Sequence, residues 1–487
     1  MFSMQISQVP LFPLLFSRLA RVGVLSVSAF LLASCGPPDR QESPGTGPVT
    51  PAEHTLFVNA TLLTGDGTVI EQGALLVRGS EIVAVGPVAE LQPPAGARRV
   101  ELDGKTVIPA LIDAHAHLGY EGYTGWGAQH YSRETLEEHL QRYSYYGFSA
   151  VLSAGSDPDG MALELQRDQR QGVVGGARFL FAAGMGPPGQ GPNDRFLVHA
   201  LEIQERSGMT VLRGLADADQ AQTAVNEVAA LGIPFIKIWV DDRGGSQDKL
   251  APGIYRPLIA AARDSGLQVL VHQQAAADMP DLLAAGVDGF LHGRLGPDLD
   301  RELALQIADA GAFLVPNLGL GELRRQRVAD DPFLQEAVPP AVVARLGDSF
   351  DQLPVSATAV DPDREAALRE SFAHLLAAGV DILLGTDAGA VPDHFFGYTG
   401  HRELEIFVRL GMTPLQAITA ATSAPARRLG LDTLGTLAPG KQADFVVLDA
   451  NPLEDIRHTR EISRVYRAGE PVDREALRSR WQAMVGQ

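Results

Sequence analysis

Two histidines stand two residues apart at the end of an apolar run, in the segment LIDAHAHLGY (residues 111–120). In a β-strand, residues i and i+2 point to the same face. The imidazoles of His115 and His117 would therefore lie side by side, where an apolar face would otherwise continue. Imidazole lone pairs are good ligands for divalent metal ions. The pair predicts a metal ion between the two rings.

Four more polar residues interrupt apolar, strand-like segments further along the chain. They are Lys237 in PFIKIWV, His272 in LQVLVHQ, His292 in VDGFLHG and Asp387 in LLGTDAG. Each has an ordinary structural interpretation: a hydrogen-bonded core histidine, a helix-capping aspartate, or a lysine that reaches solvent from an edge strand. These strand-like segments fit a closed barrel, however, in which no strand is at an edge. An unpaired ammonium group buried there is costly. We therefore favour a shared metal site.

A protonated Lys237 would be repelled by metal ions at such a site. Burial and neighbouring cations lower the pKa of a lysine and make the neutral amine available. A neutral amine can add CO2 to give a carbamate, which is anionic, has two oxygens and can bridge two cations. The residues together predict two divalent metal ions, for which these ligands favour zinc, and a CO2-derived carbamate on Lys237.

The segments between these residues indicate the fold that positions them. Eight apolar runs, from TVIPALIDAH (residues 106–115) to VDILLGTDAG (residues 380–389), alternate with amphipathic stretches such as RETLEEHLQRYSYYG. Buried parallel strands read as near-continuous apolar runs, and their alternation with helices is typical of a (β/α)8 barrel. We predict an α/β protein with a (β/α)8 TIM barrel over residues 107–435. An open, doubly wound sheet is the alternative. A barrel would gather the polar residues at the C-terminal ends of its strands.

Both ends of the chain predict short β-strands. Turn signals at Asp66-Gly67 and Gly79-Ser80 separate strand-like segments in residues 54–106, and residues 436–487 contain similar segments such as ADFVVLDANP. Neither piece is long enough to bury a core alone. We expect the two pieces to form one small β-sandwich domain built from both chain ends.

The first residues resemble an export signal. Arg18 and Arg21 precede an apolar stretch that is too short to span a membrane and typical of a signal-peptide core. The ending LLASC resembles a bacterial lipobox, which predicts a signal peptide over residues 1–34, lipidation of Cys35 and a polar tether over residues 35–53. Glycine rather than aspartate after the cysteine favours the periplasmic side of the outer membrane. An ordinary signal peptide, or a later translation start, is the alternative.

Composition limits the classes of partner. The formal net charge of −19 argues against nucleic acid, because phosphate binding needs clustered lysine and arginine. The segment GMGPPG (residues 184–189) matches a dinucleotide-binding fingerprint, but two prolines fill it and no periodic helix begins there. We expect a small-molecule substrate, contact with the membrane only through a lipid anchor, and compatibility with a homo-oligomer.

Taken together, the His-x-His pair, the lysine, the two single histidines and the aspartate resemble the amidohydrolase superfamily in its binuclear form with a carboxylated lysine. The segments VIPALIDAHAHL, GVDGFLHG, LLGTDAG and GMTPLQAITAATSAPARRLGL resemble its imidazolonepropionase-related branch. The resemblance covers about residues 54–470. Two departures stand out: Ala110 replaces the usual glycine of PGLID, and IKIWVDDRGG replaces the Thr-Gly-Gly stretch that follows the lysine strand in peptidase-like relatives.

The resemblance implies a role for each residue. One metal ion would be bound by His115, His117 and Asp387, the other by His272 and His292, with Lys237 bridging. A hydroxide held between the metals would be the nucleophile. Asp387 would orient it, take its proton and pass that proton to the leaving amine.

The expected function is hydrolysis of an amide (C–N) bond in a small substrate such as a dipeptide or N-acyl amino acid. A cyclic amide, lactone or phosphotriester hydrolase is an alternative on the same site, and a non-catalytic, ligand-binding surface lipoprotein is an alternative of another class. Four residues near loops of the same face are candidate substrate contacts, each with an ordinary core or loop role as the alternative: Tyr120, His199, Trp239 and His401.

Overall fold

A computed structural model of the chain describes residues 54–484, except 294, 323–324 and 355–357. The predicted signal peptide, the lipidation site at Cys35 and the tether lie outside the described residues. Within the described part of the chain, none of the helices combines the length and the apolar character needed to cross a membrane.

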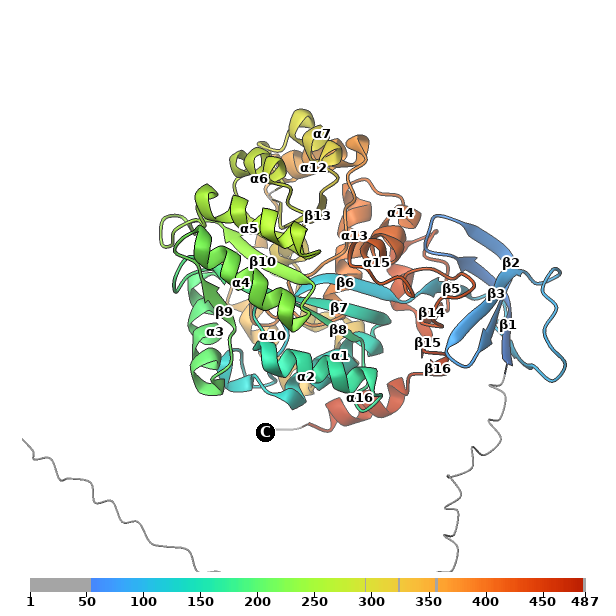
Figure 1. Ribbon diagram of the computed structural model, residues 1–487. Helices are drawn as coiled ribbons and strands as arrows, with labels where there is room; N and C mark the ends of the chain where they lie inside the picture. Colours follow the sequence, from blue (N-terminus) through green and yellow to red (C-terminus); the bar gives the residue numbers. More distant parts are fainter. Residues whose placement is uncertain (1–53, 294, 323–324, 355–357, 485–487) are drawn as a thin grey trace, which may run out of the picture. The chain divides into compact units, whose positions relative to one another are not determined.

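One β-sheet contains strands from both ends of the described chain, as predicted (Figure 1). The strands follow the order β16-β15-β14-β5-β1-β2-β3, and β4 pairs with β1. Its centre holds the rings of Phe57, Phe445 and Tyr466, the last two stacked with centroids 4.6 Å apart. The bounds are β1 (His54–Leu63), β2 (Val69–Arg78), β3 (Glu81–Pro87), β4 (Arg98–Glu101), β5 (Thr106–Pro109), β14 (Phe445–Leu448), β15 (Ile462–Arg467) and β16 (Glu470–Pro471).

The second sheet is a parallel barrel, which confirms the predicted (β/α)8 fold. Its hydrogen-bonded path runs through β6 (Leu111–Ala116), β7 (Phe148–Ala154), β8 (Arg178–Gly186), β10 (Phe235–Val240), β11 (Gln268–Gln273), β12 (Gly289–Leu291) and β13 (Phe313–Val315), with β9 (Leu212–Gly214) beside β8. The predicted eighth strand is an extended segment that closes the ring. It forms isolated bridges from Ile382 to Leu314 and from Ala388 to Ala116.

Helices cover the outside of the barrel (Figure 1). Their starts follow ordinary capping chemistry: Ser132 and Asp217 accept hydrogen bonds from the first-turn amides of α1 and α4. The main helices are α1 (Arg133–Tyr145), α2 (Asp159–Arg170), α3 (Asp194–Ser207), α4 (Ala218–Leu231), α5 (Pro252–Asp264), α6 (Met279–Ala285), α7 (Arg301–Asp309), α12 (Pro362–Ala378), α13 (Tyr398–Leu410), α14 (Pro414–Ala420), α15 (Ser423–Arg428) and α16 (Arg474–Gln482).

The chain passes directly from the small sheet into the barrel. β5 pairs with β1 and β14 of the small sheet, and Ala110 donates a backbone hydrogen bond to Asp444. The next residue, Leu111, donates to Gly147 beside the barrel. The barrel therefore begins at Leu111, a few residues beyond the boundary predicted at residue 107. The apolar run that reads as one strand is two strands in two sheets.

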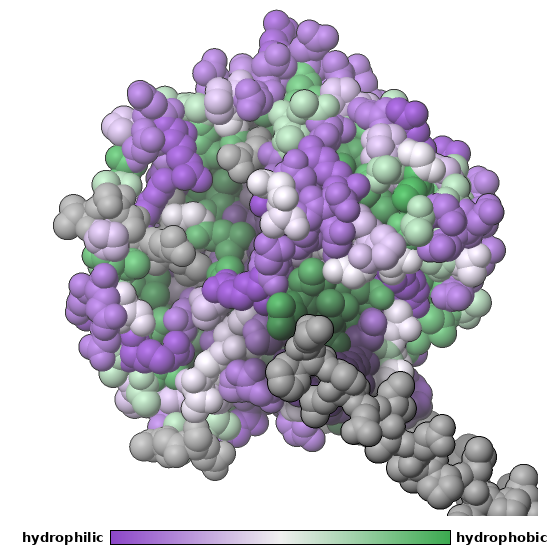
Figure 2. Space-filling view, turned by 90° about the vertical axis from the view of Figure 1, so that its left-hand side faces the viewer, coloured by the Kyte–Doolittle hydropathy of each residue, from purple (hydrophilic) through white to green (hydrophobic). Residues whose placement is uncertain are grey.

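An insertion between β13 and α12 forms part of the wall at the mouth of the barrel. It contains α8 (Gly319–Glu322), the 3-10 turn η3 (Val328–Asp330), α9 (Pro332–Gln335) and α10 (Pro340–Asp351). Figure 2 views the molecule from the left of Figure 1, the side toward which β6 runs from the small sheet. This face is hydrophilic around its rim, and apolar side chains are visible in the hollow near its centre.

Candidate metal centre

The side chains of His115, His117 and Asp387 meet inside the barrel. Oδ1 of Asp387 lies 3.3 Å from Nε2 of His115 and 3.1 Å from Nε2 of His117. All three residues are buried, and one ligand atom from each falls within 4.8 Å of the others. Within the described part of the chain, Nε2 of His115 and Oδ1 of Asp387 have no hydrogen-bond partner. The three residues can hold a metal ion.

Two neighbouring side chains orient the histidine rings. Nδ1 of His115 lies 2.8 Å from Oδ1 of Asn317, and Nδ1 of His117 lies 2.8 Å from Oγ of Ser156. Because an amide oxygen only accepts, Nδ1 of His115 carries the proton and its Nε2 lone pair is left for a ligand. Partners of this kind set the tautomer and the ring orientation of metal-binding histidines.

Asp113 connects the histidine strand to the segment that carries Asp387. Its Oδ1 accepts hydrogen bonds from the backbone amides of His115 and Thr386, each 3.1 Å long, and its Oδ2 accepts from Tyr143 (2.7 Å) and from the hydroxyl of Thr386 (2.6 Å). Burial raises the pKa of Asp113 to about 6, against the effect of these hydrogen bonds. Asp113 therefore fixes the spacing between the strand that carries His115 and the segment that carries Asp387.

We expect Asp113→Ala to destabilise the protein by about 3 kcal/mol or more, because each buried donor left unsatisfied costs roughly 1–3 kcal/mol. The measurement is the midpoint of thermal unfolding, together with metal content. Asp113→Asn is the matched control: it keeps one acceptor oxygen and should lose less. Equal unfolding midpoints for the wild type and Asp113→Ala would contradict this role.

Lys237 lies on β10 and is 1% exposed. A side chain on Gly155, which follows β7, would place its Cβ only 2.7 Å from Cβ of Lys237, so the glycine makes room for the lysine. Burial is the main cause that lowers the pKa of Lys237 to about 7; Asp387 opposes this shift and Arg243 adds to it. The neutral amine is therefore accessible near neutral pH.

His272 and His292 lie beside each other, with ring centroids 4.6 Å apart. The His292 ring also contacts the His115 ring at 5.1 Å, and its Nε2 is 3.9 Å from Oδ2 of Asp387. Nε2 of His272 has two other contacts, 2.8 Å to Nη1 of Arg243 and 3.0 Å to Oδ2 of Asp241. The barrel thus brings all six predicted residues to one end. The surroundings of His272, however, differ from those of the group formed by His115, His117 and Asp387.

Burial controls the charge state of the cluster. It holds the pKa of His115 and of His272 well below the usual histidine range and lowers that of His292 to about 4. Burial by itself would raise the pKa of Asp387, but the surrounding imidazoles outweigh it and hold this pKa well below its usual range. Neutral imidazoles beside a carboxylate form a suitable ligand set for a divalent cation.

Backbone geometry at the strand ends is also unusual. The φ angles are 81° at His292, 51° at Asn317 and 58° at Asp387, in the left-handed region that non-glycine residues seldom adopt. At Gly389 a Cβ would lie 1.9 Å from the carbonyl oxygen of His117, so the Asp387 turn approaches β6 through a residue without a side chain. Such conformations concentrate at functional sites.

The four candidate substrate contacts lie in different surroundings. Trp239 is nearest the cluster, with its ring 5.8 Å from Nζ of Lys237. Tyr120 is buried and donates to the carbonyl of Ser156 (2.6 Å). His199, on α3, accepts from the amide of Ala128 and packs against Trp126.

His401 lies on α13, and both of its ring nitrogens have protein partners: Thr459 at 3.0 Å and the carbonyl of Tyr146 at 2.8 Å. Burial lowers its pKa to about 3. The structure does not bring His401 to the cluster, and its contacts are those of a core histidine.

One residue that sequence reasoning missed is His394. It is buried, and neither of its ring nitrogens has a hydrogen-bond partner among the described residues. Burial lowers its pKa to about 4, and the charge of Asp387 opposes this shift. Its only sequence signal is a histidine shortly after the predicted strand that ends at Asp387. This imidazole therefore lies close enough to Asp387 to respond to its charge, and it lacks the protein contacts of an ordinary core histidine.

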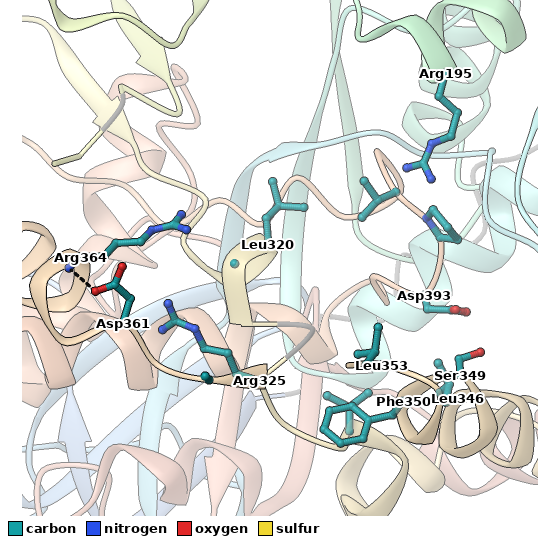
Figure 3. Close-up of a pocket in the computed structure, with 15 residues that line it drawn as sticks. Arg195, Leu320, Arg325, Leu346, Ser349, Phe350, Leu353, Asp361, Arg364 and Asp393 are labelled. Atoms are coloured by element: carbon teal, nitrogen blue, oxygen red, sulfur yellow. Dashed lines mark hydrogen bonds between the residues drawn. The ribbon is translucent and has the colours of Figure 1, made fainter. Parts of the chain in front are cut away.

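Two cavities open beside the cluster and meet along Leu320, Gly321, Arg325 and Arg364. One has a volume of about 800 Å³ and includes His292 and Asn317 in its lining, and the other has about 740 Å³. In Figure 3, Arg325 and Arg364 approach the second cavity from one side and Arg195 from the other. Arg195 and Arg364 have no ion-pair partner within the described part of the chain, whereas Arg325 lies 3.8 Å from Glu365. The same lining contains Asp361, which caps α12, and Asp393, which pairs with Arg345, so both carboxylates have partners of their own.

Comparison with known proteins adds to this geometry. The amidohydrolase family profile matches residues 106–472, more than half of the chain. The chain belongs to the amidohydrolase family. It is 27% identical over 414 residues to an imidazolonepropionase from Cereibacter sphaeroides, a match that covers 80% of this chain and 91% of that protein.

Solved structures are similar over most of the chain. A Bifidobacterium longum protein assigned as a prolidase has a TM-score of 0.64 at 26% identity, and the match covers 89% of this chain and all of that one (100%). A Xaa-Pro dipeptidase with bound methionine has a TM-score of 0.64 at 24% identity, covering 86% of this chain and 99% of that one, a likeness that shows the fold alone. This amidohydrolase is a hydrolase that acts on carbon–nitrogen bonds.

Proposed function

We propose that this amidohydrolase cleaves the amide bond of a small substrate that carries a free carboxylate, such as a dipeptide or an N-acyl amino acid. The observation that carries the proposal is the buried group of His115, His117 and Asp387, in which two ligand atoms face each other without hydrogen-bond partners among the described residues. Such a group is costly to bury unless a cation completes it.

Two divalent ions, with zinc favoured by the ligand types, would be held by this chain. One would be bound by His115, His117 and Asp387, the second by His272 and His292, and a carbamate on Lys237 would bridge them. When bound, the ions lower the pKa of a water molecule and polarise the scissile carbonyl. The low pKa of Lys237 supports the carbamate, because only a neutral amine adds CO2.

Asp387 would accept a proton from the attacking water and transfer it to the leaving amine. Its Oδ1 faces His115 and His117, and its Oδ2 faces His292 at the longer distance of 3.9 Å. Oδ2 is therefore the oxygen that can accept a proton and deliver it to the leaving amine. Asn317 and Ser156 would hold the two imidazoles in position.

The arginines of the neighbouring cavity support a carboxylate on the substrate. Arg195 and Arg364 have no ion-pair partner in the described part of the chain, and guanidinium groups match carboxylates in shape and charge. The similarity to a Bifidobacterium longum protein assigned as a prolidase supports a peptide-like substrate. The similarity to an imidazolonepropionase supports a cyclic amide as the second candidate.

A hydrolysis screen of zinc-loaded and metal-depleted protein tests the proposal. The screen compares dipeptides and N-acyl amino acids with the corresponding amides that lack a free carboxylate, and adds cyclic amides, lactones and phosphotriesters. We expect metal-dependent cleavage of the carboxylates. Preference for neutral lactones or phosphotriesters would contradict the substrate class. Tight binding of a ligand without turnover would favour the non-catalytic lipoprotein.

We also propose that the enzyme is an exported lipoprotein on the periplasmic side of the outer membrane. The lipobox-like LLASC at residues 31–35 and the polar stretch after it support this location. We expect Cys35→Ser to move the protein from the detergent phase to the aqueous phase in detergent partitioning of cells that express it. Ser43→Thr, in the tether and outside the LLASC motif, is the control. Unchanged membrane association of Cys35→Ser would refute the lipid anchor.

A further inference from the structure

Arg243 occupies an unusual position in the loop that follows β10. Its Nη1 lies 2.9 Å from Oδ2 of Asp241 and 2.8 Å from Nε2 of His272, and its Nη2 donates to the carbonyl of Gly191 at 3.0 Å. The side chain is 13% exposed, and its φ angle of 55° is in the left-handed region. The guanidinium is therefore held in place beside a proposed metal ligand.

The contacts of His272 leave its Nε2 without a lone pair to offer a metal ion. A guanidinium only donates, so its contact with Nε2 uses that lone pair as the acceptor. If Nε2 instead carries a proton and donates to Asp241, 3.0 Å away, the lone pair is again absent. In the first arrangement the neutral ring carries its proton on Nδ1, so neither nitrogen can bind an ion. In the second arrangement Nδ1 keeps a lone pair that can bind one.

The charge of Arg243 acts on the residues that would surround the second ion. Burial is the largest cause that lowers the pKa values of Lys237, His272 and His292, and the positive charge of Arg243 lowers all three further. Asp241 faces this charge as its counter-anion. The guanidinium thus adds positive charge beside the residues that would hold the second ion.

We propose that the contact of the Arg243 guanidinium with His272 and a second metal ion on His272 exclude each other. The inference rests on the metal centre proposed above. The first ion binds at His115, His117 and Asp387 without disturbing Arg243. The second binds only when the guanidinium leaves Nε2 of His272, whose N–H can then donate to Asp241 while Nδ1 is offered to the ion. This gives a function to the segment VDDRGG, which stands where peptidase-like relatives carry a Thr-Gly-Gly stretch.

Zinc titration of the metal-depleted protein, followed by native mass spectrometry and calorimetry, tests the inference without any substrate. We expect the wild type to bind one ion tightly and a second more weakly. Arg243→Gln should tighten the second step by about tenfold or more, in the range of changes next to metal ligands, and leave the first step unchanged. Asp241→Asn should weaken the second step. Arg195→Gln removes a positive charge from the neighbouring cavity and should change neither step.

Opposite effects of Arg243→Gln and Asp241→Asn separate this mechanism from general damage to the fold, which would weaken both steps. Crystals of the wild type at one and at two equivalents of zinc give a second measurement that needs no variant. We expect the contact between Arg243 and His272 at one equivalent and its loss at two. Two bound ions with that contact intact, or an unchanged second step in Arg243→Gln, would overturn the inference while the metal centre stands. Failure to bind any ion would overturn both.

Discussion

A Lys237→Arg variant is expected to lose at least about 100-fold in kcat/KM, although it keeps a long basic side chain at the same position. Lys237 is 1% exposed, and burial lowers its pKa to about 7, so the native amine can be neutral and carry CO2. A guanidinium stays protonated and cannot form a carbamate. The variant should therefore also lose bound metal, which elemental analysis of the purified protein measures alongside kcat/KM.

Two further measurements locate the effect at the carbamate. Wild-type enzyme reconstituted with zinc in bicarbonate-free buffer should recover slowly and regain full activity when bicarbonate is added. Acetate or propionate should partly rescue Lys237→Ala by supplying an anion in the vacated space. Lys249→Arg, at a lysine that pairs with Asp278, is the control and should behave as the wild type. An intact mass showing unmodified Lys237 in a fully metallated, active enzyme would exclude the bridge.

Asp387→Asn is expected to lower kcat by about 10²–10⁴-fold while most of the metal is retained. The amide keeps an oxygen toward His115 and His117 but removes the carboxylate that accepts the proton. The substitution suits the backbone, because φ at this position is 58° and asparagine tolerates left-handed conformations better than most residues. Steady-state kinetics and metal content, measured on the same preparation, separate the loss of the base from the loss of the ion.

Asp381→Asn is a matched control at the opposite end of the same segment. Asp381 pairs with Arg427 and Arg428, so this variant should lower stability slightly and leave kcat unchanged. Near-normal turnover in Asp387→Asn would show that Asp387 binds or packs but does not transfer protons.

The barrel could be predicted because its strands carry a strong local signal. Each is an apolar run, and each proposed ligand interrupts or ends such a run at the C-terminal side. The boundary between the two sheets could not be predicted, because residues 107–112 are all apolar and nothing local indicates that Ala110 bonds to one sheet and Leu111 to the other. The eighth strand was located, but it closes the ring by isolated bridges, which depend on both of its neighbours.

The proposed ligands could be identified from sequence because their types are unusual inside apolar strands. Their supporting residues could not. Asn317, Ser156 and His394 follow strands as ordinary loop residues, and only the closed barrel brings them to the cluster. His401 shows the opposite case. A histidine after the last barrel segment resembles a candidate substrate contact, but it lies on α13 and its ring is hydrogen-bonded within the core. The sequence indicated Arg243 only as part of IKIWVDDRGG, the segment that differs from the Thr-Gly-Gly stretch of peptidase-like relatives.

The direct passage from β5 to β6 also affects the order in which the protein can fold as the chain emerges, N-terminus first. β5 lies between β1 and β14, and β14 follows more than three hundred residues later. One edge of β5 therefore has to wait for its partner until almost the whole chain has emerged, and an unpaired strand edge is prone to wrong pairing. A chain that ends before Phe445 would contain every proposed metal ligand and still leave that edge open, on the strand that leads into the paired histidines. We expect premature termination there to yield aggregated protein rather than a smaller working enzyme.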